Sequence, residues 1–262
     1  MAESLTGVRV VITRPEGQSA ALSQRLRALG ARPIRFPVIA LVPADAGGEL
    51  DQALTHVADY DWIIFTSVNG VAHFWARLAA VSGTPADELR GIPGFQGRLA
   101  AIGPATAAAL EQRGATVHLV PGEYRAEAIL SAIGEVGGLY VLLPRADIAR
   151  AELAHGLRER GATVIEVAAY RTVLATPSAA AFKALRHGVD IVTFTSASTV
   201  RSFATLTRDM AYGDPLVACI GPVTADAARE LGLRVDVVAE EYTVDGLIEA
   251  LRRLWTDHTR PN

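Results

Sequence analysis

This chain of 262 residues is poor in cysteine, and its single Cys219 cannot form an internal disulfide. It also lacks any apolar run approaching the roughly 20 residues that a membrane helix needs. The first residues, MAESLTG, have neither the basic start nor the apolar core of a signal peptide. These absences predict a cytoplasmic protein that does not bind a membrane.

Charge of either sign is also scarce. One fifth of the residues are charged, the formal net charge is −3, and no block of Lys or Arg is interleaved with aromatic residues. The chain therefore lacks the electrostatic footprint of a nucleic-acid-binding protein. Lys183 is the only lysine among 25 basic residues, which we ascribe to genome composition rather than to selection for anion binding.

Sequence motifs of nucleotide binding and covalent catalysis are missing as well. No GxGxxG follows a predicted strand, no GxxxxGK[ST] occurs, and no GxSxG marks a nucleophile elbow. The six histidines are scattered without the spacing of metal ligands, and Cys219 lies in an apolar segment. We therefore expect no metal site, no bound nucleotide and no covalent intermediate.

One stretch of the sequence occurs twice. Residues 60–74 read YDWIIFTSVNGVAHF, and residues 189–203 read VDIVTFTSASTVRSF. In each copy a run rich in Ile, Val and Phe predicts a buried parallel strand, and Thr-Ser then precedes a helix. At such a junction the hydroxyl and the unpaired N–H groups of the first helical turn can bind a carboxylate or phosphate. Two copies predict two anion-binding positions facing one ligand.

The other segments repeat too, in the order A, B, A, B. Each A is a strand, a helix and an extended segment; each B holds Phe-Thr-Ser, then Ile-Gly-Pro, then Glu-Tyr. This alternation predicts an α/β fold of two similar, doubly wound, flavodoxin-like lobes with parallel sheets. The residues leave open whether the lobes are sequential, or whether the first A joins the second B around an inserted middle lobe.

Some individual segments carry their own predictions. Three prolines in residues 32–43 exclude a helix there and favour an exposed edge strand or a linker that crosses between lobes. Residues 116–120 are expected to form a strand. Residues beyond Leu254 are expected to form a loose tail.

Ligands of open parallel sheets bind at the carboxyl ends of the strands, so residues there are candidates for binding. The small hydroxyl and glycine residues predicted at these ends are Ser67, Gly103, Thr106, Ser196, Ser198, Gly221 and Thr224. Helix capping is the alternative role of any single hydroxyl. Arg14 and Arg145 also follow strands, and each is expected either to bind a carboxylate or to pair with a neighbouring acid.

Six motifs, taken in order, resemble uroporphyrinogen-III synthase. They are TRPxxQ at 13–18, FTSxNGV at 65–71, IGPATAxAL at 102–110, YRT at 170–172, FTSxSTV at 194–200 and IGPVTA at 220–225. Each motif alone is weak, but their order and the double repeat are specific. The resemblance covers almost the whole chain.

The resemblance implies an enzyme, a hydro-lyase that needs no cofactor. Its substrate would be hydroxymethylbilane, a linear tetrapyrrole with eight carboxylates, closed to uroporphyrinogen III with loss of water and inversion of the last pyrrole ring. Tyr170 is implied as the general acid that assists departure of the hydroxyl, although packing is the commoner role of a strand tyrosine. Asn69 joins the strand-end residues in substrate binding. We further expect a monomer supplied by hydroxymethylbilane synthase.

The family's architecture also implies how the chain is divided. Residues 1–37 and 174–262 would form domain 1, and residues 41–168 would form an inserted domain 2. Residues 38–40 and 169–173 would be the two linker strands between the domains.

Two other functions stay open from the sequence. The matched positions include no strong acid or base, which favours a non-catalytic relative that binds a tetrapyrrole or another anion for regulation. A glycosyltransferase with two similar lobes is the other alternative, and it would bind nucleotide sugars.

Overall fold

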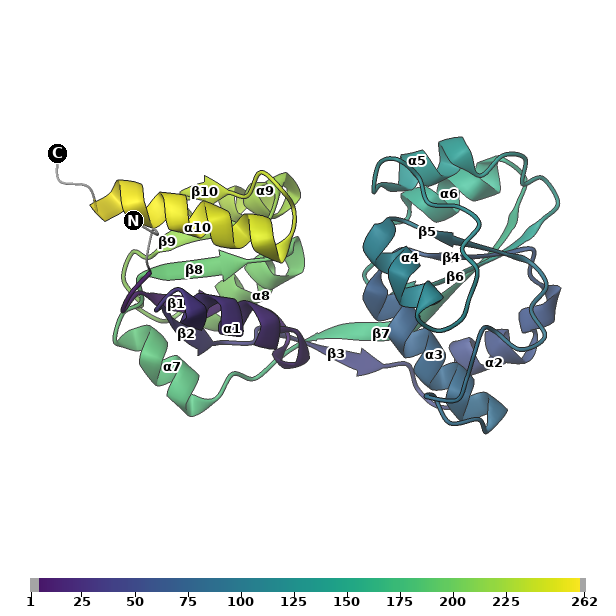
Figure 1. Cartoon of the computed structure of the whole chain (residues 1–262), viewed down its shortest axis with the longest axis horizontal. Helices are drawn as coiled ribbons and strands as arrows, with labels where there is room; N and C mark the ends of the chain where they lie inside the picture. Colours follow the sequence, from purple (N-terminus) through teal and green to yellow (C-terminus); the bar gives the residue numbers. More distant parts are fainter. Residues whose placement is uncertain (1–4, 260–262) are drawn as a thin grey trace. The chain divides into compact units, whose positions relative to one another are not determined.

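The structure is a computed structural model that describes residues 5–259. The chain separates into two compact units (Figure 1). Unit 1 runs from the N-terminus to Ala40 and resumes at Val173, whereas unit 2 is the intervening Leu41–Thr172. Each unit contains one five-stranded sheet with helices on both of its faces.

The sheet of unit 1 is parallel and has the strand order β10-β9-β8-β1-β2. Numbered along the unit, this is the 2-1-3-4-5 order of flavodoxin-like folds. Its strands are β1 (Arg9–Ile12), β2 (Arg32–Arg35), β8 (Ile191–Phe194), β9 (Leu216–Cys219) and β10 (Val237–Val238).

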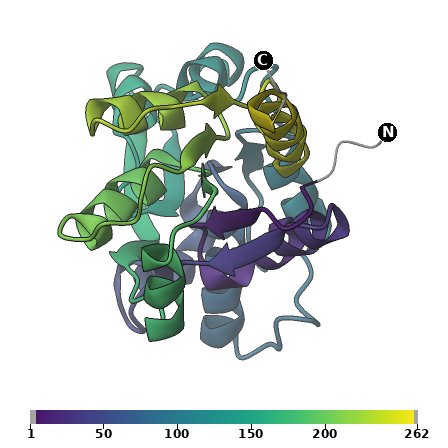
Figure 2. The same cartoon turned by 90° about the vertical axis from the view of Figure 1, so that its left-hand side faces the viewer.

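Helices cover both faces of this sheet, as the view in Figure 2 shows. One face carries α1 (Ala20–Ala28) and α10 (Val244–Thr259), and the other carries α7 (Ala179–Arg186), α8 (Ala197–Thr207) and α9 (Pro222–Glu230). A short 3-10 helix, η1 (Glu16–Gln18), precedes α1. Alternate residues of a strand point to opposite faces, so Val10 packs with Leu22 while Val11 packs with Phe203. Burial on both faces explains why the inner strands β1, β8 and β9 are almost continuously apolar.

The sheet of unit 2 has the order β3-β7-β6-β4-β5, and β4 to β7 pair in parallel. Its strands are β3 (Ile39–Pro43), β4 (Trp62–Phe65), β5 (Arg98–Ala101), β6 (Tyr140–Ala146) and β7 (Thr163–Leu174). The sequence repeat matches β6, β7, β4 and β5 to β1, β2, β8 and β9, and these four strands have the same order in both sheets. Unit 2 therefore repeats four strands of unit 1, but its fifth strand, β3, lies at the edge beside β7, whereas β10 of unit 1 lies at the other edge, beside β9.

The proline-containing segment 32–43 forms an edge strand in each sheet, first β2 and then β3. Edge positions tolerate proline because one side of the strand needs no ladder hydrogen bonds. β3 runs antiparallel to the end of β7: the Ala44 N–H donates to Ala169 O (3.2 Å), and the Ala175 N–H donates to Val38 O (3.0 Å). Both β3 and β7 continue through the division between the units.

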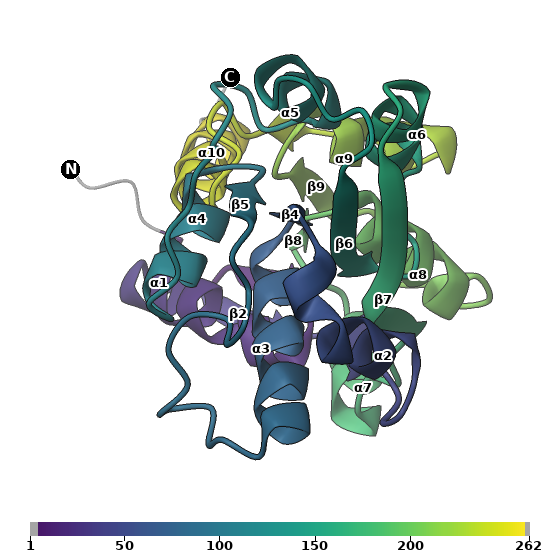
Figure 3. The same cartoon turned by 90° about the vertical axis from the view of Figure 1, so that its right-hand side faces the viewer.

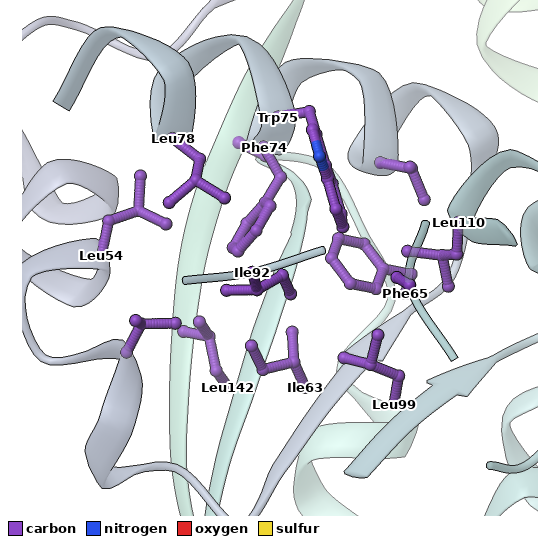
Figure 4. Packing of buried hydrophobic residues seen from close by; sticks show 14 of the residues in the cluster. Leu54, Ile63, Phe65, Phe74, Trp75, Leu78, Ile92, Leu99, Leu110 and Leu142 are labelled. Atoms are coloured by element: carbon purple, nitrogen blue, oxygen red, sulfur yellow. The ribbon is translucent and has the colours of Figure 1, made fainter. Parts of the chain in front are cut away.

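Unit 2 is likewise covered on both faces (Figure 3). The helices α2 (Glu49–Thr55), α3 (Val68–Ser82) and α4 (Pro104–Glu111) share one core with the sheet, and α5 (Ala126–Ala132) and α6 (Glu152–Glu159) share the other; η2 (Val57–Asp59) follows α2. In the first core Phe65 meets Phe74 edge-on with ring centroids 5.2 Å apart, and Trp75 lies beside both (Figure 4). This core fixes the start of α3 against the end of β4.

Two local predictions were wrong. Residues 255–259 are not a loose tail, because α10 continues to Thr259 and packs Leu254 and Trp255 against the core of unit 1; the rest of the predicted tail, residues 260–262, lies outside the described residues. Residues 116–120 do not form a regular strand, since only Leu119 bridges to Ala100. The ring of His118 accepts the Leu99 N–H (3.1 Å), so a side chain takes a hydrogen bond that a strand would make.

Candidate functional site

The carboxyl end of β8 in unit 1 leads directly into a capped helix. Ser196 is the N-cap of α8: its Oγ accepts from the Thr199 N–H (3.2 Å), and its own N–H donates to Thr199 Oγ1 (3.3 Å). This reciprocal capping box satisfies two backbone donors of the first turn. Ser198 lies beside it, with 2.9 Å between the two Oγ atoms. Ser196 therefore caps the helix, and Ser198 extends the hydroxyl cluster at this edge.

Arg14 follows the adjacent strand β1, at the same edge of the sheet. Its Nη2 donates to Gln18 Oε1 over a long 3.4 Å, and its buried Nε has no hydrogen-bond partner within residues 5–259. Burial lowers the pKa of the guanidinium from its ordinary value. No carboxylate in the described part of the chain pairs with Arg14, which leaves its charge available to a ligand.

Unit 2 presents the matching edge at the end of β4. Ser67 is the N-cap of α3 and accepts from the Gly70 N–H (3.0 Å). Asn69 lies half-buried in the first turn of that helix. A Cβ on Gly70 would lie 3.1 Å from the carbonyl oxygen of Pro144, so glycine allows α3 to approach β6 closely.

Tyr170 lies at this same edge, because its partner in the parallel β6–β7 ladder is Ala146, the last residue of β6. Its side chain is buried, its hydroxyl is 3.5 Å from Ser67 Oγ, and its ring stacks on that of His73 with centroids 5.0 Å apart. Burial lowers the pKa of His73. A neutral imidazole and a serine hydroxyl thus hold the phenol in one orientation.

Arg145 is placed differently from its counterpart Arg14. Its guanidinium forms an ion pair with Glu166 (2.6 Å) and donates to the carbonyl oxygens of Arg150 (2.8 Å) and Ala149 (3.3 Å). Glu166 also pairs with Arg158 (2.7 Å). Of the two roles weighed from the sequence, pairing with an acid is the one the structure shows for Arg145.

The glycine and threonine pairs occupy equivalent positions in the two units. Gly103 is the N-cap of α4 and Gly221 the N-cap of α9, both with extended backbone that any residue can adopt. Thr106 and Thr224 lie in the first turns, with exposed fractions of 4% and 5%. Among the described residues neither threonine hydroxyl has a hydrogen-bond partner, unlike the capping hydroxyls of Ser67 and Ser196.

Tyr124 and Tyr242 were missed as site residues, although the repeated Glu-Tyr pair marked them in the sequence. A Cβ on Gly103 would lie 3.0 Å from Tyr124 Cδ1, and one on Gly221 would lie 3.3 Å from Tyr242 Cδ1. Each tyrosine ring therefore lies against the glycine that caps the helix of its own unit.

A hollow of about 740 Å³ in unit 2 lies elsewhere, lined by α2 and the first half of β7. Of the residues discussed above, only Glu166 and Arg158 line it. We place the candidate site at the strand ends instead, because the hydroxyls, Arg14 and the helix N-termini gather there. Within residues 5–259, no three His, Cys, Asp or Glu side chains come together as metal ligands. No helix of that range is long and apolar enough to span a membrane.

Two flavodoxin-like units, each with hydroxyl side chains and helix N-termini at the carboxyl edge of its sheet, define a two-unit α/β protein whose strand ends have groups suited to anionic ligands. A family model described as uroporphyrinogen-III synthase HemD matches residues 20–249. The chain belongs to the uroporphyrinogen-III synthase family, a family of lyases.

Individual relatives agree with this assignment. The chain is 34% identical to uroporphyrinogen-III synthase of Synechococcus elongatus, over 99% of this chain and 100% of that one. A putative uroporphyrinogen-III synthase of Methanothermobacter thermautotrophicus is 32% identical over 92% and 96%. The fold matches a mutant uroporphyrinogen III synthase from the extremely thermophilic bacterium Thermus thermophilus, with a TM-score of 0.66 and 23% identity over 96% of this chain and 100% of that one. It also matches the Helicobacter pylori enzyme, with a TM-score of 0.64, 18% identity and coverage of 95% and 100%.

Proposed function

We propose that this protein closes hydroxymethylbilane to uroporphyrinogen III, with loss of water and inversion of the last pyrrole ring, and that no cofactor takes part. Membership of the family carries the proposal. The position of Tyr170 supports it, because its phenol lies at a strand-end edge within 3.5 Å of the Ser67 hydroxyl. A general acid must lie where a bound substrate can come within hydrogen-bond distance of it.

The groups at the two edges suit a substrate with many carboxylates. The first turns of α3, α4, α8 and α9 present backbone N–H groups and the positive ends of helix dipoles. The hydroxyls of Thr106 and Thr224, which have no partner among the described residues, can donate to carboxylate oxygens. Arg14 adds a positive charge that no acid neutralises in residues 5–259. Several carboxylates can thus be bound by a chain with a net charge of −3.

The other candidate residues take parts in the same binding proposal. Asn69 and Ser198 add polar groups beside the capping residues Ser67 and Ser196. Gly103 and Gly221 leave the N-termini of α4 and α9 open to a ligand. Arg145 would have to exchange Glu166 for a substrate carboxylate, so we assign it the smallest part in binding.

The chemistry requires cleavage of the carbon–oxygen bond of the hydroxymethyl group. Tyr170 would donate its phenolic proton to the departing hydroxyl, which leaves as water, and the substituted carbon of the last ring would bond to the methylene carbon so released, giving a spiro intermediate. The bond from that ring carbon to its original methylene bridge would then break, the bridge would bond to the unsubstituted carbon of the same ring, and the proton lost from that carbon would restore the phenol. A phenol is a weak acid at neutral pH, so this proton transfer makes a modest contribution.

The way the protein positions the substrate contributes more to the outcome of the reaction than proton transfer does. The bilane also closes without an enzyme, but to the unrearranged isomer I, so the protein must direct which carbon attacks. Each 1.36 kcal/mol of preference changes the product ratio about tenfold. A few hydrogen bonds that fold the chain correctly therefore decide the outcome.

We also propose a cytoplasmic monomer that receives its substrate from hydroxymethylbilane synthase. Residues 38–40 and 169–173 would serve as linkers between a domain of residues 1–37 and 174–262 and a domain of residues 41–168. The passage of β3 and β7 from one compact unit into the other supports this division.

A coupled assay tests the proposed reaction. Hydroxymethylbilane is generated in place, the protein is added, the products are oxidised, and porphyrin isomers I and III are separated by chromatography. We expect mainly isomer III. Isomer I alone, from protein shown to be folded by circular dichroism, would overturn the proposal and leave a non-catalytic tetrapyrrole-binding relative as the hypothesis to test.

A further inference from the structure

Two exposed tyrosines occupy equivalent positions in the two units. Tyr124 follows the bridging residue Leu119 in unit 2, and Tyr242 follows β10 in unit 1. Their exposed fractions are 67% and 66%, compared with 50% for Tyr140. Removing a large aromatic ring from water is energetically favourable. Two such rings exposed at equivalent positions are therefore candidates for contact with a ligand.

The backbone holds both tyrosines in the same way. The Arg125 N–H donates to Glu123 O (3.0 Å) across Tyr124, and the Thr243 N–H donates to Glu241 O (2.8 Å) across Tyr242. Each tyrosine is thus the middle residue of a three-residue turn. The turn fixes the direction in which the ring leaves the chain, although the ring itself stays largely uncovered.

Both rings lie against the glycine that caps a helix. The extended backbone of Gly103 and Gly221, with φ of −170° and −172°, suits any residue, so conformation does not require glycine there. Space does require it, because a Cβ would come within 3.0 Å of the Tyr124 ring and within 3.3 Å of the Tyr242 ring. The glycines therefore make room for the rings beside the helix N-termini.

A second feature in the same helices points to a ligand. Thr106 and Thr224 are 4% and 5% exposed and lie within the first turn of α4 and α9, and neither hydroxyl has a partner among the described residues. Each unit thus sets a flat aromatic face beside an unpaired hydroxyl and the N-terminus of a helix. A ligand that fits is an aromatic ring with carboxylates on short side chains.

We propose that Tyr124 and Tyr242 are substrate-binding residues, and that each covers the face of a pyrrole ring whose carboxylates reach the N-terminus of α4 or α9. This inference rests on the proposed function, since the pyrroles are those of the tetrapyrrole. The ring rather than the phenolic hydroxyl makes the contact, so phenylalanine can replace tyrosine.

Alanine and phenylalanine variants test the contact. We expect Tyr124→Ala and Tyr242→Ala each to raise KM about tenfold and to weaken calorimetric binding of uroporphyrinogen III similarly, with kcat changed less than about threefold. Tyr124→Phe and Tyr242→Phe should stay near wild type. The matched control is Tyr140→Ala, because Tyr140 is exposed but begins β6, at the amino end of the strand. Its KM and binding should not change.

A double-mutant cycle tests the link between glycine and ring. Gly103→Ala should weaken binding in the wild-type background by displacing the Tyr124 ring, and it should have a smaller effect once Tyr124 is alanine. Equal effects in both backgrounds would show that Gly103 acts without the ring and would contradict the inference.

The outcomes separate this inference from the proposed function. If the wild type forms isomer III but both alanine variants keep its KM and its affinity, the tyrosine contact is wrong and the proposed function stands. If the wild type forms no isomer III but binds uroporphyrinogen III, weaker binding by the alanine variants still supports the contact, and unchanged binding overturns it. A wild type that neither converts nor binds overturns both.

Discussion

The imidazole of His73 stacks on the phenol of Tyr170, with ring centroids 5.0 Å apart and planes inclined by 26°. His73 belongs to α3 and Tyr170 to β7. The contact therefore joins the helix that follows β4 to a different strand of the same sheet. A charged imidazole in this half-buried position would lose solvation, and burial accordingly lowers the pKa of His73 from its ordinary 6.5. Burial thus favours the neutral form of the imidazole that stacks on the Tyr170 ring.

This burial predicts a pH dependence of stability. As the pH falls through 6.5, the unfolded chain takes up the His73 proton before the folded protein does, so the free energy of unfolding decreases. The contribution is fully present above pH 6.5 and is lost as the pH falls toward the lowered pKa. Urea unfolding of the wild type and of His73→Phe at pH 7.5 and 5.5 measures it. The loss at pH 5.5 should be smaller in the variant, and an equal loss would mean that His73 does not contribute.

Replacing Tyr170 by Phe tests the catalytic role of the phenol. The ring and its stacking stay, and only the 3.5 Å contact with Ser67 is lost, so stability should change by less than about 1 kcal/mol. We expect kcat for isomer III to fall about tenfold to a hundredfold, with KM nearly unchanged. Steady-state kinetics with Tyr140→Phe as the control decide this. Unchanged turnover would remove the acid role and leave the fold assignment intact.

The two equivalent arginines should respond differently to substitution. Arg14→Gln removes a charge that has no carboxylate partner among the described residues, so KM should rise about tenfold without loss of stability. Arg145→Gln breaks the ion pair with Glu166, which keeps Arg158, so about 1–2 kcal/mol of stability should be lost. Kinetics and urea unfolding of both variants test the contrast. The predicted contrast would be wrong if Arg145→Gln changed KM more than Arg14→Gln does.

The difference between Arg14 and Arg145 also shows where prediction from the sequence ends. The repeat made both arginines candidates, because local patterns of apolar and hydroxyl residues place a strand end in front of each. Glu166, however, lies on the neighbouring strand β7 and reaches Arg145 only through the register that pairs Leu143 with Glu166. No local pattern predicts such a partner, although the two possible roles could be stated in advance.

The same limit applies to contacts between distant segments. The strands of both sheets and most helices could be predicted from the periodicity of apolar residues, which is a local property of the chain. The segment after α3 is rich in Gly and Pro, a composition typical of surface loops, yet it buries Leu89 and Ile92 in the core of unit 2. The stacking of His73 on Tyr170 was not predicted either, because it depends on how α3 crosses the sheet.

Cys219 provides a test of burial in unit 1. It lies fully buried in β9 between β8 and β10, and desolvation raises the pKa of its thiol to about 12. Since the thiolate is the reactive form, the native protein should resist a disulfide reagent at pH 8, while the protein in denaturant should react with one equivalent. Absorbance at the wavelength of the released thiol measures both. Rapid stoichiometric reaction of the native protein would show that the strand opens locally.

A substitution that removes the hydroxyl of Thr106 or Thr224 should affect substrate binding more than stability. Neither hydroxyl has a partner among the described residues, and neither oxygen is one of the fully buried unpaired polar atoms of that range, so Thr→Val at either position should change stability by less than about 1 kcal/mol. The same change removes a donor for a substrate carboxylate, so KM should rise about fivefold to tenfold. Thr→Ser keeps the hydroxyl and should keep KM near that of the wild type. Urea unfolding and steady-state kinetics of the four single variants measure both effects. Wild-type kinetics for both valine variants would mean that the strand-end site is misplaced, because neither hydroxyl would then contribute to substrate binding.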